Sequence, residues 1–179
     1  NVIIKKPGTP GYENSEPLII QGHMDMVCVK TDDSNHNFDT DPIEMIVEGD
    51  VLRANNTTLG GDDGIAVAYG LAILDADDIP HPPLELLVTT NEETGMDGAM
   101  ALTADHLTGT RLLNLDTEVE GEFLVSCSGG SNIDLSFDIA REANSSKAYK
   151  LSISGLKGGH SGVEIDKQRA NAIKLAARL

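Results

Sequence analysis

Short apolar runs alternate with a helical stretch along the first two thirds of the chain, and this order constrains the fold more than any other feature. Residues 17–21, 84–89 and 111–115 have the length and apolar character of buried strands. Residues 64–75 have helical spacing and are rich in small side chains that permit close packing on a sheet. Strands that alternate with helices are typical of an α/β sheet covered by helices. We therefore predict an α/β domain.

Three further segments fit this domain. Residues 2–4 are an apolar strand, residues 98–102 begin a second helical stretch, and residues 43–53 have the pattern of a hairpin that turns at Gly49.

The pattern changes after residue 130. Residues 133–139 and 148–154 alternate apolar and polar side chains, which predicts strands with one wet face, and an amphipathic helix is expected over 170–179. We therefore predict one domain over residues 1–129 and the start of a separate α+β domain over 130–179. The chain begins at the predicted strand over residues 2–4 and ends inside the predicted helix over 170–179, so we expect a piece of a longer protein.

Composition excludes several classes of function. The 29 Asp and Glu residues against 13 Lys and Arg residues give a net charge of −16, which argues against binding to nucleic acid or to anionic membranes. The longest apolar stretch, residues 64–74, has about half of the roughly 20 residues that a membrane span requires. Two cysteines provide no disulfide framework, so we expect a reducing compartment and a cytoplasmic protein.

Polar side chains follow each predicted strand, where ligands of α/β proteins usually bind. His23 and Asp25 come after the first strand, in positions that point to one face of an extended chain. Asp62 precedes the helix at residues 64–75. Taken alone, the first pair also fits a structural hydrogen bond, and an aspartate before a helix also fits the helix dipole.

Acidic residues follow the later strands as well. Glu92 and Glu93 come after residues 84–89, and Asp116 follows residues 111–115. So many carboxylates cannot stay ionised together without cations. Carboxylates with an imidazole and no thiolate suit zinc, manganese or cobalt. An additional glutamate beside the metals could act as the general base of a hydrolase.

Four motifs resemble those of the aminoacyl-histidine (Xaa-His) dipeptidases, which belong to the aminoacylase and glutamate-carboxypeptidase superfamily of two-metal hydrolases. The motifs cover residues 23–27, 60–64, 91–95 and 114–118, and a fifth segment at 155–162 is typical of the subgroup. The resemblance implies a three-layer zinc-exopeptidase-like catalytic domain followed by a lid and dimerisation domain. It also implies dipeptide substrates, among them those with a C-terminal histidine, and a homodimer formed through the lid.

The resemblance also implies roles for individual residues. Two divalent ions, with zinc expected first and manganese or cobalt as alternatives, would share Asp62. His23 and Asp116 would complete one site and Glu93 the other, while Glu92 would act as the general base that deprotonates the attacking water. Asp25 would orient His23. The family carries asparagine where this chain has Asp63.

Other histidines complete the predicted site. The family takes one further metal-binding histidine from a segment well downstream, so residues 1–179 alone are expected to hold at most one metal ion tightly and to show no turnover. His160 would reach the active site of a partner subunit and stabilise the oxyanion, and its alternative is a histidine bonded to the local backbone. His36, His81 and His106 are expected at the surface.

Two rival functions are weaker. A non-catalytic relative or an inert fragment would act as a binding module. A calcium loop would use Asp33, Asn35, Asn37, Asp39, Asp41 and Glu44, which fall at EF-hand ligand spacing, but Phe38 replaces the central glycine and Pro42 interrupts the loop. A serine hydrolase is excluded because neither Ser128 nor Ser161 lies in a nucleophile elbow.

Overall fold

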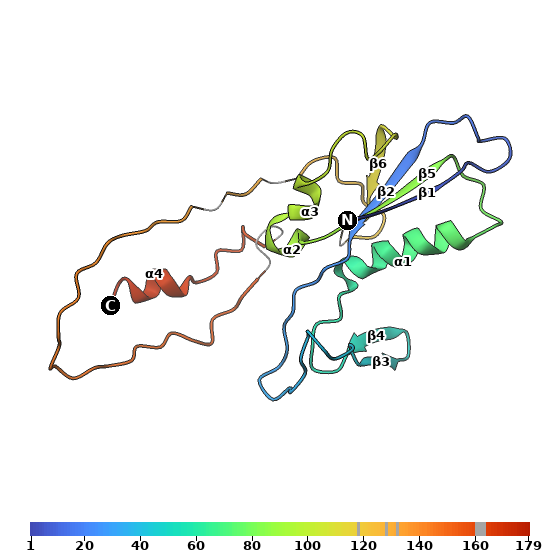
Figure 1. Ribbon diagram of the computed structural model, residues 1–179. Coiled ribbons are helices and arrows are strands. Elements are labelled where there is room, and N and C mark those ends of the chain that lie inside the picture. Colours follow the sequence, from blue (N-terminus) through green and yellow to red (C-terminus); the bar gives the residue numbers. More distant parts are fainter. Residues whose placement is uncertain (118, 128, 132, 160–163) are drawn as a thin grey trace. The chain divides into compact units, whose positions relative to one another are not determined.

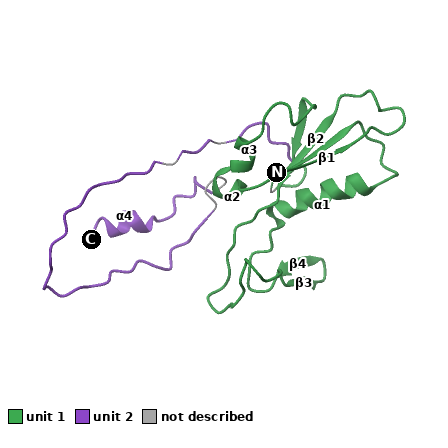
Figure 2. Ribbon diagram, in the orientation of Figure 1, with its two compact units in different colours: residues 1–121 green, residues 122–179 purple. Residues whose placement is uncertain are grey.

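A computed structural model describes residues 1–179 except 118, 128, 132 and 160–163. It divides into two compact units, residues 1–121 and residues 122–179 (Figure 2). The first unit contains the sheet and the candidate site. The domain boundary expected near residues 129–130 stays a prediction.

A four-stranded sheet forms the centre of the first unit, with the strand order β1-β5-β2-β6 (Figure 1). The two inner strands and β6 run parallel, and β1 pairs antiparallel with β5. The predicted α/β fold is confirmed, because the runs at 84–89 and 111–115 lie in one sheet. The strands are β1 (Val2–Lys6), β2 (Leu18–His23), β5 (Leu84–Thr89) and β6 (Arg111–Asn114).

Helix α1 (Gly61–Asp75) packs on one face of this sheet (Figure 1). The buried core under the helix consists of Ile20, Leu84, Leu86 and Val88. Gly70 permits a close approach, since a Cβ atom there would lie 2.4 Å from the Cδ1 atom of Leu86. At the other end of the helix, Lys6 donates to the carbonyls of Leu74 and Ala76 at 2.8 and 2.7 Å and caps the C-terminus.

The opposite face of the sheet buries a carboxylate. Glu85 is 2% exposed and lies next to Leu87, which is also buried. Its carboxylate accepts hydrogen bonds from the backbone N–H groups of Thr108 and Gly109, and Lys5 pairs with it at 2.6 Å. These contacts attach the segment before β6 to the centre of the sheet.

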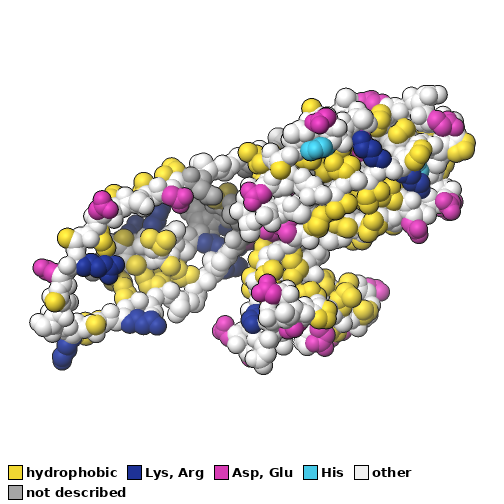
Figure 3. Space-filling model, viewed as in Figure 1, with side chains coloured by type: hydrophobic (Ala, Val, Ile, Leu, Met, Phe, Trp, Pro, Cys, Tyr) yellow, Lys and Arg dark blue, Asp and Glu magenta, His cyan; other side chains and the backbone are white. Residues whose placement is uncertain are grey.

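A separate hairpin, β3 (Met45–Glu48) and β4 (Val51–Ala54), confirms the turn predicted at Gly49. Its side chains Met45, Val47 and Val51 are exposed. Hydrophobic side chains accordingly gather over the hairpin and over α1 in the space-filling view (Figure 3).

The remaining elements are short. Helices α2 (Glu92–Gly95) and α3 (Asp97–Met100) follow β5, and α4 (Ala172–Ala176) lies in the second unit. The helical stretch expected from residue 98 thus ends at Met100, and the helix expected over 170–179 is confined to α4. Along the described part of the chain, no helix is long and apolar enough to cross a membrane.

The prediction of strands over 133–139 and 148–154 is wrong. The structure assigns no strand to the residues that it describes in these segments. Leu135 and Phe137, which were to form the apolar face of the first strand, are 74% and 79% exposed. An alternating pattern gives a chain one apolar face, but a strand also needs a neighbouring backbone to pair with.

Candidate metal centre

The carboxyl ends of β2, β5 and β6 meet at one edge of the sheet, together with the first turn of α1. His23 is the last residue of β2, and Glu92 and Glu93 begin α2 just after β5. Asp116 lies two residues beyond β6, and Asp62 lies in the first turn of α1. This edge is a topological switch point of the sheet, because β5 and β6 lie on opposite sides of β2.

His23 is the centre of this group and is 1% exposed. Its Nε2 atom lies 3.2 Å from Oδ1 of Asp62, 3.8 Å from Oδ2 of Asp116 and 4.0 Å from Oε2 of Glu92. Its Nδ1 atom lies 2.9 Å from the backbone oxygen of Asp25. The carbonyl oxygen can only accept a hydrogen bond, so Nδ1 carries a hydrogen. Nε2 donates to Asp62 when the ring is protonated, and in the neutral ring its lone pair is free to bind a metal ion.

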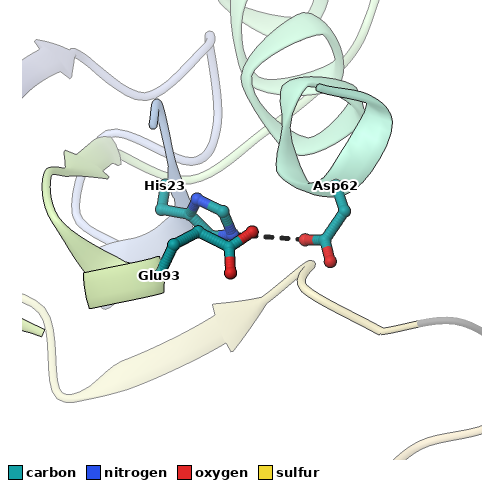
Figure 4. A group of neighbouring side chains, drawn as sticks. All are labelled: His23, Asp62 and Glu93. Atoms are coloured by element: carbon teal, nitrogen blue, oxygen red, sulfur yellow. Dashed lines mark hydrogen bonds and ion pairs between the residues drawn. The ribbon is translucent and has the colours of Figure 1, made fainter. Parts of the chain in front are cut away.

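Two sets of three side chains have the spacing of metal ligands. One set is His23, Asp62 and Glu93 (Figure 4), and the other is His23, Glu92 and Asp116. Within each set, one ligand atom of every residue lies within 4.8 Å of the others. Bonds of about 2.0–2.2 Å from zinc to nitrogen and oxygen place two ligands of one ion roughly 3–4.4 Å apart. The distances from Nε2 of His23 to the carboxylate oxygens fall in this range. Nitrogen and oxygen are also the donor atoms that suit a divalent metal such as zinc.

Charge and burial shift the pKa values of the central groups. Burial alone would lower the pKa of His23, but the hydrogen bond to the Asp25 carbonyl, the charge of Asp116 and the hydrogen bond to Asp62 raise it above its usual value. Burial raises the pKa of Glu92 above its usual value, the charge of His23 opposes this rise, and the neighbouring carboxylates add to it. A divalent cation would relieve this crowding of negative charge.

Asp25 connects β2 to the glutamates. Its carboxylate oxygens accept the backbone N–H groups of Glu92 and Glu93 at 3.1 and 3.2 Å. Burial opposes ionisation, but these hydrogen bonds outweigh it and hold the pKa of Asp25 below its usual value. The carboxylate also lies 3.6 Å from Nδ1 of His23. Asp25 thus contacts His23, Glu92 and Glu93. The other predicted catalytic residue, His160, lies outside the described residues.

Sequence reasoning missed the contact of Asp63. This side chain is 1% exposed, and its Oδ2 atom accepts the backbone N–H of His23 at 3.1 Å. Burial raises the pKa of Asp63 to about 6. Gly22 makes the contact possible, because a Cβ atom there would lie 2.6 Å from the same oxygen. The two glycines 60 and 61 before the Asp-Asp pair were the available signal, since they indicated a close backbone approach.

The rival calcium loop does not form a ligand cluster in the part of the chain that the structure describes. Its side chains bond to their own backbone instead: Asp41 accepts from the N–H of Asn37, and Asn37 accepts from the N–H of Asp39.

The expectation of a surface position is wrong for His81. It is 4% exposed because Thr9 holds it with a pair of hydrogen bonds, in which each residue donates its N–H to an oxygen of the other.

Comparison with known proteins relates the chain to peptidases. No family model matches it. Over 180 aligned residues it is 44% identical to the cytosol non-specific dipeptidase of Escherichia coli, an alignment that covers 99% of this chain and 37% of the relative. The chain thus spans about a third of the length of the relatives it matches.

Solved structures give the same result. The crystal structure of the aminoacylhistidine dipeptidase from Vibrio alginolyticus matches with a TM-score of 0.69 and 41% identity, over 98% of this chain and 36% of that one. The aminopeptidase PepT from Bacillus cereus matches with a TM-score of 0.51 and 26% identity, over 65% of this chain and 29% of that one. In sequence and in fold, nearly the whole chain is similar to a segment of these dipeptidases, and this similarity agrees with the resemblance of its motifs.

Proposed function

We propose that the protein that contains this chain is a metal-dependent dipeptidase, with its active site at the carboxyl ends of β2, β5 and β6. The observation that carries the proposal is the position of His23, whose Nε2 atom lies within 4.0 Å of carboxylate oxygens of Asp62, Glu92 and Asp116. The similarity to two dipeptidases over nearly the whole chain supports the same activity.

The proposed ligands of two divalent ions follow from the resemblance, whereas the spacing in the structure groups Glu93 with His23 and Asp62, and Asp116 with His23 and Glu92. Asp62 would serve both ions, His23 and Asp116 would hold one, and Glu93 would hold the other, with a further histidine supplied by the rest of the protein. Zinc fits a set of one imidazole and several carboxylates, and manganese and cobalt are the alternatives. When bound, the ions polarise the peptide carbonyl and acidify the attacking water.

Glu92 is the proposed general base. Its side chain lies at the edge of the group, where Oε2 is 4.0 Å from Nε2 of His23. The raised pKa of Glu92, which burial and nearby carboxylates cause, makes it a stronger base than an ordinary glutamate. Glu92 takes a proton from the attacking water and returns it to the leaving amine. Asp25 holds the backbone of Glu92 and thus the position of the base.

The roles of the second domain come from the resemblance alone. We propose that residues 130–179 begin a lid through which two subunits associate, and that His160 of one subunit stabilises the oxyanion in the other. Dipeptides, including those with a C-terminal histidine, are the proposed substrates, and the cytoplasm is the proposed location.

Removal and return of the metal test this function in the full-length protein. Dialysis against a chelator should abolish the hydrolysis of dipeptides, and stoichiometric zinc, manganese or cobalt should restore it. The variant His23→Ala should not recover activity at the metal concentration that restores the unmodified protein. Hydrolysis that persists in protein shown by elemental analysis to be metal-free would contradict the proposal.

A further inference from the structure

A row of polar side chains crosses three strands just behind the candidate metal centre. It consists of Asn114 at the end of β6, Gln21 in β2 and Thr89 at the end of β5. Gln21 is opposite Asn114 in the parallel register, and Thr89 is opposite His23. Alternate residues of a strand share a face, so Gln21 and His23 lie on the same side of the sheet. Gln21 lies two residues before His23, further from the carboxyl end of β2.

The hydrogen bonds of this row run in one direction. Asn114 donates from Nδ2 to Oε1 of Gln21 at 2.5 Å, and Gln21 donates from Nε2 to Oγ1 of Thr89 at 3.3 Å. The Thr89 hydroxyl then donates to the backbone oxygen of Gly22 at 3.3 Å. Hydrogen bonds aligned in this way polarise and strengthen one another.

Both ends of the row reach the backbone beside a proposed metal ligand. At one end, Oδ1 of Asn114 accepts the backbone N–H of Asp116 at 3.1 Å. At the other end, the carbonyl of Gly22 belongs to the residue immediately before His23. The last backbone bond between the two strands joins Leu115 to Gln21, so Asp116 lies beyond the regular pairing of β6. The contact from Asn114 is a local bond within the segment after β6, and the same side chain joins this segment to β2 through Gln21.

We propose that Asn114, Gln21 and Thr89 are positioning residues, which set the place of Asp116 relative to His23 and thereby the affinity of the metal site that these two ligands share. This inference rests on the proposed function. Outer partners of metal ligands typically change affinity by about 10–100-fold when they are removed. The distance of 3.8 Å between Nε2 of His23 and Oδ2 of Asp116 is the geometry that the row maintains.

Two substitutions of Thr89 form a matched pair. Thr89 is 3% exposed, and Thr89→Val keeps its shape but removes the hydroxyl, whereas Thr89→Ser keeps the hydroxyl. Gln21→Met breaks the row at its centre and retains the length of the side chain. Zinc affinity of the metal-free, full-length protein is measured by competition with a chelator, and thermal unfolding of the same samples reports on folding.

Thr89→Val and Gln21→Met should weaken zinc binding about tenfold, and Thr89→Ser should stay within about twofold of the unmodified protein. In an Asp116→Ala background, Gln21→Met should change the remaining zinc affinity less than about twofold, because the ligand that it positions is gone. The melting temperature should not follow this pattern, as it would if the row served only the stability of the sheet.

Unchanged zinc affinity in Thr89→Val and Gln21→Met would overturn the inference, and so would an equal loss in the presence and absence of Asp116. Either result leaves the proposed function intact, since the unmodified protein would still bind zinc and hydrolyse dipeptides. An unmodified protein that binds none of zinc, manganese and cobalt would overturn the proposed function itself.

Discussion

The backbone N–H of His23 donates to the buried carboxylate of Asp63 at 3.1 Å. Asp63 is the neighbour of the proposed metal ligand Asp62, and it thus holds the end of β2, which carries the proposed ligand His23. A buried N–H without an acceptor costs about 1–3 kcal/mol. Asp63→Asn and Asp63→Ala both remove the charge, but only asparagine keeps an acceptor.

We predict that metal-free Asp63→Asn is more stable than Asp63→Ala by about 1–3 kcal/mol, as measured by denaturant unfolding at neutral pH. Equal stabilities of the two variants would show that the hydrogen bond to His23 contributes nothing.

Glu85 should make the protein sensitive to acid. Burial opposes its ionisation, but Lys5 and the N–H groups of Gly109 and Thr108 outweigh burial and lower the pKa of Glu85 to about 2. A carboxylate with a lowered folded-state pKa stabilises the protein above its unfolded pKa, and this stability is lost as the pH falls toward the folded value. The loss should therefore occur between about pH 4.5 and pH 2.

Glu85→Gln tests this assignment. The pKa difference corresponds to an upper bound of about 3 kcal/mol, so the variant should lose up to that amount at pH 7. It should also show a flatter decline in unfolding free energy below pH 4.5 than the unmodified protein. An identical acid profile in both proteins would contradict the assignment.

Lys6 should stabilise the C-terminus of α1. The last turn of this helix contains no basic residue of its own, and Lys6 supplies a cation from β1 with bonds to Leu74 and Ala76. Lys6→Met should cost about 1–2 kcal/mol, because charged hydrogen-bond donors at a helix C-terminus are worth about that much. Lys147→Met, at an exposed position of the second unit, is the control and should change the unfolding free energy by less than about 0.5 kcal/mol.

The positions of the chemical groups could be predicted from the sequence, because they depend on strand order. Once three parallel strands are expected, His23, Glu92 and Asp116 must lie near the same edge of the sheet. The glycines before Asp62 indicated a close backbone approach, but they did not identify the partner of Asp63, since Asp62 and Asp63 leave helical geometry inside the first turn of α1. A helical wheel begun at residue 62 would place these side chains incorrectly.

The local sequence pattern also failed to predict burial and strand formation where these depend on contacts with distant parts of the chain. His81 lies between prolines in a polar turn that reads as exposed, yet its bonds to Thr9 bury it. Residues 133–139 alternate as a strand should, but alternation specifies only a face and not the neighbour that the backbone needs.

The isolated chain of residues 1–179 should differ from the whole protein in metal binding. In the proposed assignment, His23, Asp62 and Asp116 would give one site three protein ligands, whereas Asp62 and Glu93 would give the other only two carboxylates, which bind a transition metal poorly. We predict at most one tightly held metal ion per chain after dialysis and no appreciable hydrolysis of dipeptides. Two retained ions, measured by elemental analysis, would show that the ligands are misassigned.

The measurement that tests the central claim most directly is the turnover and metal content of Glu92→Gln in the full-length protein. If Glu92 is the general base, kcat should fall at least about a hundredfold while the bound metal stays the same. Glu13→Gln, which makes the same change in the loop between β1 and β2, should leave both unchanged. Full activity in Glu92→Gln, or the loss of a metal ion together with activity, would contradict the role of Glu92 as a base.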